Sequence, residues 1–186
     1  MSKLNQRTTC DYINFVEATQ KGKELMKEEK TNLIGFYILI AINTGLRVSD
    51  IKRITFEDLS KGELKFKEQK TNKYKSLPLN ETIKKAITKL SKFGAGAVFK
   101  SQKNQIISTQ HLNTLLKTAF NNLLPTHCIS SHSLRKTFGR RVYELNNRSE
   151  DSLIKLSELF NHSSIKLTRI YLGIKREELN DIYMSL

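Results

Sequence analysis

The sequence of 186 residues predicts a mainly α (α+β) fold, a helical domain that carries one small β-hairpin. Apolar residues recur at helical spacing along most of the chain, whereas the stretch from Glu63 to Leu79 alternates with a period of two. No repeat, low-complexity tract or Pro/Gly-rich linker divides the chain. Because a domain ordinarily has about 100–200 residues, we expect residues 1–186 to form a single domain.

Helical patterns fill the first quarter of the chain. We expect a helix over residues 8–18, a charged helix that continues to about Glu29, and a buried helix over residues 31–43. The apolar run "LIGFYILIAI" of the third has ten residues, whereas a membrane span needs about 20, so it predicts a core helix. Gly45 in "NTG" suits a left-handed C-cap, and a short helix is expected to start near Ser49 or Asp50.

A β-hairpin follows, and helices then resume. "ELKFKE" and "YKSLPL" alternate as strands do, and the polar "KTNK" between them predicts the turn. The tail "KREELNDIYMSL", residues 175–186, has the pattern of a short amphipathic helix. Further helices are expected over residues 81–92, 108–123, 133–146, 151–160 and 163–172.

The composition is strongly basic. The chain has 32 Lys and Arg against 18 Asp and Glu, a formal net charge of +14, which is typical of a protein with a polyanionic partner. Nucleic acid fits better than an anionic membrane, because the basic residues are spread along the chain and not gathered on one amphipathic face. Composition alone leaves open a basic protein without any polyanionic ligand.

The N-terminus "MSKLNQRTTCDY" lacks the apolar core of a signal peptide, so we expect a cytoplasmic protein. In that reducing compartment, Cys10 and Cys128 are expected to remain thiols. His127, Cys128 and His132 lie close in sequence, but no fourth ligand follows at zinc-finger spacing. We therefore predict no metal site.

Several short motifs carry candidate functional side chains, and each has an ordinary structural explanation when taken alone. Arg47 in "NTGLRVSD" follows the buried helix, where an arginine is usually solvated. Lys70 lies in the hairpin turn, where an exposed lysine is common. His132 and Arg135 in "SSHSLRKTF" share a helix face, but an H-x-x-R match arises often by chance in a basic protein.

A further motif, "LFNHSSIKLTRIYL", places His162 nine residues before Tyr171. A tyrosine has a pKa of about 10 and is a poor nucleophile unless neighbouring groups activate it. A tyrosine at the end of an apolar helix is most often part of the core.

Taken together and in this order, the motifs resemble those of the tyrosine recombinase family, also called the phage integrases. The resemblance extends over roughly residues 8–175 and matches all six catalytic positions of the family. These positions are Arg47, Lys70, His132, Arg135, His162 and Tyr171.

The resemblance implies an enzyme that cleaves and rejoins DNA strands through a 3′-phosphotyrosyl intermediate. Arg47 and Arg135 would clamp the phosphate oxygens, because a planar guanidinium bonds two oxygens at once and keeps its charge. Tyr171 would attack the phosphorus in line. The arginines would take the place of metal ions as stabilisers of charge, so the resemblance implies no metal and no other cofactor.

The remaining three positions would handle protons. Lys70 on its hairpin would protonate the leaving 5′ oxygen as a general acid. His132 would accept the proton of the tyrosine or orient its hydroxyl, and His162 would donate to a non-bridging oxygen.

The implied partner is double-stranded DNA, bound by a chain that is monomeric in solution and assembles into dimers or tetramers on DNA, without a membrane. Arg47 follows only 46 residues, which leaves no room for the additional N-terminal helical domain of the family, so we expect a catalytic domain alone, either taken from a longer protein or a natural short form that relies on partners. Two alternatives stay open. A type IB topoisomerase would relax supercoils with the same chemistry, and a catalytically silent DNA-binding protein would use only the basic surface, with no need for Tyr171 at this interval.

Overall fold

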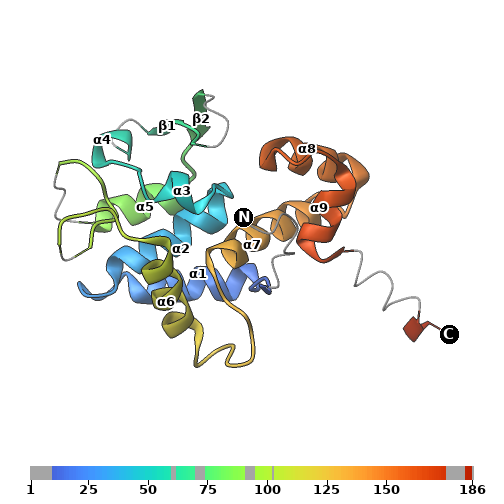
Figure 1. Ribbon diagram of the computed structural model, residues 1–186, viewed down its shortest axis with the longest axis horizontal. Coiled ribbons are helices and arrows are strands. Elements are labelled where there is room, and N and C mark those ends of the chain that lie inside the picture. The colour runs from blue at the N-terminus through green and yellow to red at the C-terminus, as the bar shows by residue number, and fades with distance from the viewer. Residues whose placement is uncertain are drawn as a thin grey trace, which may run out of the picture.

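The computed structural model describes residues 10–59, 62–69, 74–90, 95–101, 103–174 and 183–185. Within these ranges helices dominate, and two antiparallel strands form one small sheet (Figure 1), which confirms the predicted fold class. The elements in chain order are α1 (Phe15–Leu25), α2 (Asn32–Thr44), α3 (Val48–Ile51), α4 (Phe56–Leu59), β1 (Glu63–Lys67), β2 (Tyr74–Pro78), α5 (Glu81–Lys89), α6 (Thr109–Phe120), α7 (Ser131–Leu145), α8 (Glu150–Phe160) and α9 (Ile165–Leu172).

Helix α2 is the centre of the fold. Its residues are apolar on almost every face, and it packs against α1, α5, α6 and α7 (Figure 1). Gly45 caps its C-terminus in the left-handed conformation with φ 62°, as predicted, and donates its N–H to the carbonyl of Ala41 at 3.0 Å. In the part of the chain that the structure describes, no helix is both long and apolar enough to cross a membrane.

The predicted hairpin is confirmed by the pairing of β1 with β2. Glu63 lies opposite Pro78 and Lys67 opposite Tyr74, so the two strands pair along their whole length. The turn between them, residues 70–73, lies outside the described residues, and Lys70 with it.

The prediction of two helices over residues 8–18 and on to Glu29 is wrong. One helix, α1, replaces them, and Asn14 caps it by accepting bonds from the N–H groups of Val16 and Glu17. Residues 10–13 stay non-helical because their backbone bonds to distant parts of the chain. Asp11 donates to the carbonyl of Cys128 at 3.1 Å, and Ile13 donates to Thr137 Oγ1 at 3.0 Å. Tertiary pairing overrides the helical pattern here.

Smaller differences have local causes. Helix α7 begins two residues before the predicted position, because Ser130 and Ser133 form a reciprocal capping box. The one-turn helix α4 was not predicted, since four residues carry too little periodicity to be recognised. The predicted tail helix falls largely outside the described residues, which resume only at residues 183–185.

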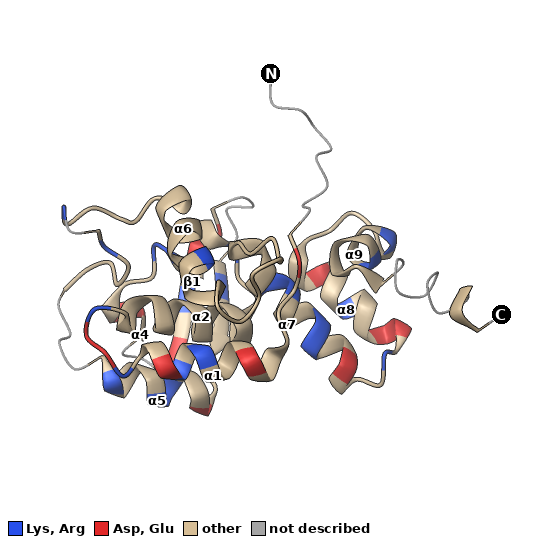
Figure 2. Ribbon diagram, turned by 90° about the horizontal axis from the view of Figure 1, so that it is seen from below, with Lys and Arg blue, Asp and Glu red and all other residues tan. Residues whose placement is uncertain are grey.

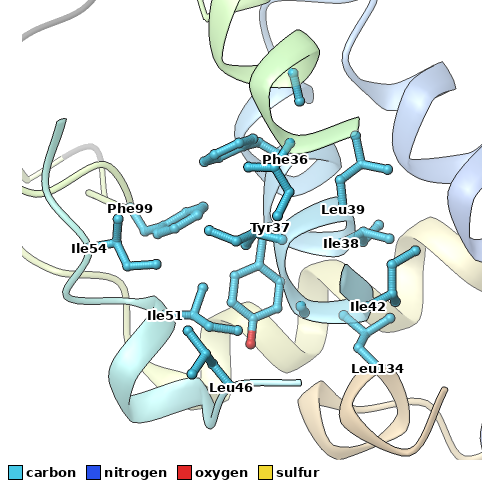
Figure 3. Packing of buried hydrophobic residues seen from close by; sticks show 14 of the residues in the cluster. Phe36, Tyr37, Ile38, Leu39, Ile42, Leu46, Ile51, Ile54, Phe99 and Leu134 are labelled. Carbon is cyan, nitrogen blue, oxygen red and sulfur yellow. The ribbon is translucent and has the colours of Figure 1, made fainter. Parts of the chain in front are cut away.

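Buried apolar side chains form two separate groups. The large core surrounds α2, where Phe36 and Tyr37 pack against Phe99, and Leu134 of α7 reaches it from the side (Figure 3). The small cluster lies between α7, α8 and α9, and consists of Leu153, Leu156, Phe160, Leu172 and Ile174. Helix α7 joins the two groups, because Phe138 and Val142, further along it, pack on the small cluster.

Candidate active site

A cavity of about 220 Å³ lies where the large core meets the small cluster. Its walls come from the turn after α2, the first turns of α7, the end of α8 and the end of α9. The residues from the predicted set that line it are Arg47, His132, Arg135, His162 and Tyr171. Segments more than 120 residues apart in sequence thus meet at one opening.

Arg47 enters the cavity from the N-cap position of α3, where its backbone is extended. Its Nη2 donates to the carbonyl oxygen of Phe160 at 2.9 Å, and its Nη1 donates to the carboxylate of Glu68. A guanidinium has five N–H donors, so these two bonds leave others for a ligand.

Arg135 lies deeper, with only 7% of its surface exposed. Its Nη1 donates to the carbonyl of Gly45, its Nη2 donates to the carbonyl of Phe160 at 3.2 Å, and its guanidinium carbon lies 4.2 Å from the centre of the Phe160 ring. Burial lowers the pKa of Arg135 to about 10, which still leaves the side chain charged at neutral pH.

The carbonyl of Phe160 therefore holds both arginines. It is available because α8 ends there and the next residue, Asn161, adopts the left-handed conformation with φ 54°. The last carbonyls of a helix have no partner within it, so they can bind side-chain donors. The two guanidiniums are thus fixed side by side by one atom of the small cluster.

Tyr171 stands at the end of α9, at the edge of the same cavity. Its hydroxyl donates to the backbone carbonyl of His132 at 3.4 Å, and its ring packs edge-on against Phe160 and His162. Burial raises the pKa of Tyr171, an effect that the charge of Arg135 partly opposes. The hydroxyl is consequently protonated at rest and needs a base to become a nucleophile.

The two histidines have different surroundings. Loss of water around the His132 ring, followed by the positive charges of Arg135 and Lys136, lowers the pKa of His132 below its usual value. A neutral imidazole of this kind can accept a proton at neutral pH. The Nδ1 of His162 is 2.9 Å from Thr168 Oγ1, and this contact with a fully buried threonine fixes the ring.

Lys70 lies outside the described residues, and the residue before it, Gln69, is described. The N–H of Gln69 donates to Asp50 Oδ1 at 3.1 Å, and Asp50 belongs to α3, directly after Arg47. Gln69 is therefore held against the segment that carries Arg47.

Sequence reasoning missed two acidic residues at the site. Glu68 and Asp50 are 3% and 4% exposed, and both belong to segments that border the cavity. One signal was present for Glu68, because it continues the inward alternation of Leu64 and Phe66 along β1. For Asp50 we find no signal in the sequence beyond its place in a short helix.

Ser131, at the start of α7, was also missed. Its hydroxyl is buried and lines the cavity, and it has no hydrogen-bond partner among the described residues. A buried hydroxyl without a partner costs about 1–3 kcal/mol, so the cavity is suited to a ligand that offers acceptor oxygens. Across the described ranges, no three His, Cys, Asp or Glu side chains are grouped as metal ligands.

Comparison with known proteins identifies the family. Residues 14–178 match the model of the phage integrase family. The chain is 30% identical over 177 residues to the probable integrase/recombinase YoeC of Bacillus subtilis (strain 168), covering 92% of this chain and 93% of that protein. It is 28% identical over 152 residues to tyrosine recombinase XerC of Caldanaerobacter subterraneus subsp. tengcongensis, covering 77% of this chain but 42% of that relative.

The fold is also that of solved recombinases. The XerH site-specific recombinase, in a post-cleavage complex with palindromic difH substrate, matches with a TM-score of 0.68 and 20% identity. The match covers 98% of this chain and 56% of that one, so our chain spans about half the length of XerC and XerH. With the family model matched over most of its length, the chain belongs to the phage integrase family of tyrosine recombinases.

Proposed function

We propose that this chain is a site-specific DNA recombinase that cleaves and rejoins strands through a 3′-phosphotyrosyl intermediate. The observation that carries the proposal is the meeting of two fixed arginines, two histidines and one tyrosine in a single cavity. Family membership supports it, as does the XerH relative, which was solved with its DNA substrate after cleavage.

In the cleavage step, the scissile phosphate binds between Arg47 and Arg135. Both guanidiniums donate to its non-bridging oxygens, whose negative charge grows as the phosphorus becomes pentacoordinate. Because protein carbonyls already hold both side chains, little reorganisation is needed when that charge develops. The arginines supply the positive charge that a metal ion supplies in other phosphoryl-transfer sites, so the proposed reaction needs no metal.

Proton transfers accompany the attack. The Tyr171 hydroxyl gives its proton to His132 as its oxygen bonds to phosphorus, and the bond from phosphorus to the 5′ oxygen breaks. Lys70 gives its proton to that oxygen, which leaves as a hydroxyl. His162, oriented by Thr168, donates to a non-bridging oxygen. Rejoining reverses these steps, with the 5′ hydroxyl attacking the phosphotyrosine.

Charge supports DNA as the partner. The net charge is +14, and Figure 2 shows Lys and Arg on many elements, including α7, the helix that contributes Arg135 to the cavity. Since the XerH substrate is palindromic, and a two-fold symmetric site takes two copies of a protein, we propose that this chain assembles on DNA in more than one copy and is monomeric without it. Light scattering with and without a duplex tests this, and a stable tetramer without DNA would contradict it.

The reaction is tested by covalent trapping. Nicked suicide duplexes made from fragments of the source genome lose their 5′-hydroxyl piece after cleavage, so the DNA-linked protein accumulates and shifts on a denaturing gel. The wild-type chain should give that band, and Tyr171→Phe should not, because it removes only the attacking oxygen.

Tyr143→Phe is the matched control, since Tyr143 packs on the same small cluster but lies outside the cavity lining. It should leave the covalent band unchanged. A band that persists in Tyr171→Phe would assign the nucleophile elsewhere, and relaxation of plasmid without joined products would favour the topoisomerase alternative.

A further inference from the structure

Glu68 is an anionic side chain beside a site that is expected to take a phosphate. It follows β1 directly, is 3% exposed, and its carboxylate accepts from Nη1 of Arg47. The ammonium of Lys75, on β2, lies 3.6 Å from the same oxygen, Oε1. Glu68 thus links the turn after α2 to both strands of the hairpin.

A buried carboxylate at this position is expected to add little to the stability of the fold and to weaken the binding of DNA. Removing two charges from water costs several kcal/mol per ion, so a buried ion pair is often no better than an apolar contact. A carboxylate near a phosphate also repels it. The placement of Glu68 is better explained by the geometry that it imposes.

The geometry concerns Arg47 first. Its two protein contacts, to the Glu68 carboxylate and to the Phe160 carbonyl at 2.9 Å, engage the two terminal nitrogens of the guanidinium. Because both nitrogens are held, the plane of the guanidinium is fixed, and the direction of its remaining donors is fixed with it. A planar fork bonds two phosphate oxygens only when it is correctly oriented.

The same carboxylate also fixes the turn end of the hairpin. Glu68 is held by Arg47, and the next N–H, that of Gln69, is held by Asp50. Lys70 is the following residue. The last two residues before the proposed general acid are therefore tied to the segment that carries Arg47.

We propose that Glu68 is a positioning residue, which orients Arg47 toward the scissile phosphate and holds the end of β1 against the segment that carries Arg47. The inference rests on the proposed function. Glu68 touches neither substrate nor the reacting atoms in this proposal, and it acts through Arg47. Its loss should slow cleavage without weakening the binding of DNA.

The test uses the full chain with Glu68→Gln, which keeps the size of the side chain, and Glu68→Asp, which keeps its charge but shortens it. Glu63→Gln is the matched control, because Glu63 belongs to the same hairpin and contacts Lys65 and Ser76, but its side chain is 50% exposed. All three variants and the wild type are compared with the suicide duplex. Cleavage rates are measured at saturating protein, and non-covalent affinity by fluorescence anisotropy.

Both Glu68 variants should cleave about 10- to 100-fold more slowly, the loss expected when a catalytic group is misplaced by about 1 Å. Affinity should stay the same in Glu68→Asp and stay the same or rise in Glu68→Gln, which removes a negative charge. Glu63→Gln should cleave at the wild-type rate. Cleavage by Glu68→Gln at the wild-type rate would overturn the inference. Faster cleavage would also overturn it, and would show that Glu68 competes with the phosphate for Arg47.

A second measurement separates this inference from the proposed function. In the ¹⁵N spectrum of the arginine side chains, Arg47, assigned through Arg47→Lys, should give separate Nη signals because rotation of its held guanidinium is slow. These signals should merge in Glu68→Gln and persist in Glu63→Gln. If the wild type does not cleave, the proposed function fails, while unchanged Arg47 signals in Glu68→Gln would overturn the role of Glu68 independently.

Discussion

The large core and the small cluster differ greatly in size, yet each positions residues of the candidate site. The large core surrounds α2 with side chains from six other helices, α7 among them, and from the hairpin, and it fixes Arg47 and the turn end of the hairpin. The small cluster has five buried apolar residues, yet it contributes Phe160 and packs directly against Tyr171. The proposed phosphate clamp and the proposed nucleophile therefore belong to regions of very different size.

This difference suggests how the site can be both ordered and adjustable. Regions with few buried apolar contacts open locally at a lower free energy than the rest of a protein. The small cluster is such a region, and one of its atoms, the Phe160 carbonyl, holds both arginines. Opening of the small cluster should thus remove the nucleophile and loosen the clamp together, while the large core stays folded.

The largest expected effect comes from cavities made in the two regions. Leu39→Ala in the large core and Leu156→Ala in the small cluster each remove a buried leucine, 2% and 1% exposed, at a cost of about 2–5 kcal/mol. Leu39→Ala should lower the free energy of global unfolding. Leu156→Ala should instead speed amide hydrogen exchange in α8 and α9 and leave α2 protected. Equal acceleration in α2 would show that the two regions unfold as one.

The helix that joins the regions offers a more specific test. Arg135→Lys keeps the charge but loses the planar fork that bonds Gly45 and Phe160, so cleavage should fall by about 10²- to 10³-fold. Arg141→Lys is the control, because Arg141 lies on the same helix but stacks on Phe15, away from the cavity. The rates of covalent attachment to the suicide duplex are measured for both variants. Similar rates for Arg135→Lys and Arg141→Lys would contradict the role proposed for Arg135.

A smaller effect is expected from pH. His132 must be neutral to accept the proton of Tyr171, and its pKa is lowered by burial and by Arg135 and Lys136. Cleavage should therefore be constant around neutrality and fall only below about 6.5, the unperturbed value of histidine, losing up to about tenfold per pH unit. Rates between pH 5 and 8 check this, with His111→Gln as a control on an exposed histidine outside the cavity. A midpoint above 6.5 would contradict the proposed environment of His132.

Much of the large core could be predicted from sequence, because its signals are local. The apolar run of α2, the glycine that caps it and the alternation of the hairpin are all properties of neighbouring residues. The start of α1 could not be predicted in this way, since residues 10–13 are held by Cys128 and Thr137. The error lies where the backbone pairs with a distant segment.

In the candidate site too, features with a local sequence signal could be predicted, and features set by distant contacts could not. Its candidate side chains were predicted from motifs, and the cavity brings five of the six together, but the groups that hold them were not predicted. The Phe160 carbonyl bears no sequence signature, because its role depends on the left-handed Asn161 that follows it. Glu68 looks like an ordinary strand glutamate until the fold places it against Arg47. Contacts across the boundary between the two regions decide these roles, and no local pattern records them.

The central claim is that the small cluster presents Tyr171 to a phosphate held by Arg47 and Arg135. It is tested most directly by locating the covalent bond. The trapped complex is digested with nuclease and protease, and fragment spectra identify the residue that keeps the nucleotide phosphate. The account predicts that the phosphate is found on Tyr171, in the peptide that also contains α9 residues. A phosphate on any other residue, Tyr143 or Tyr183 included, would contradict it.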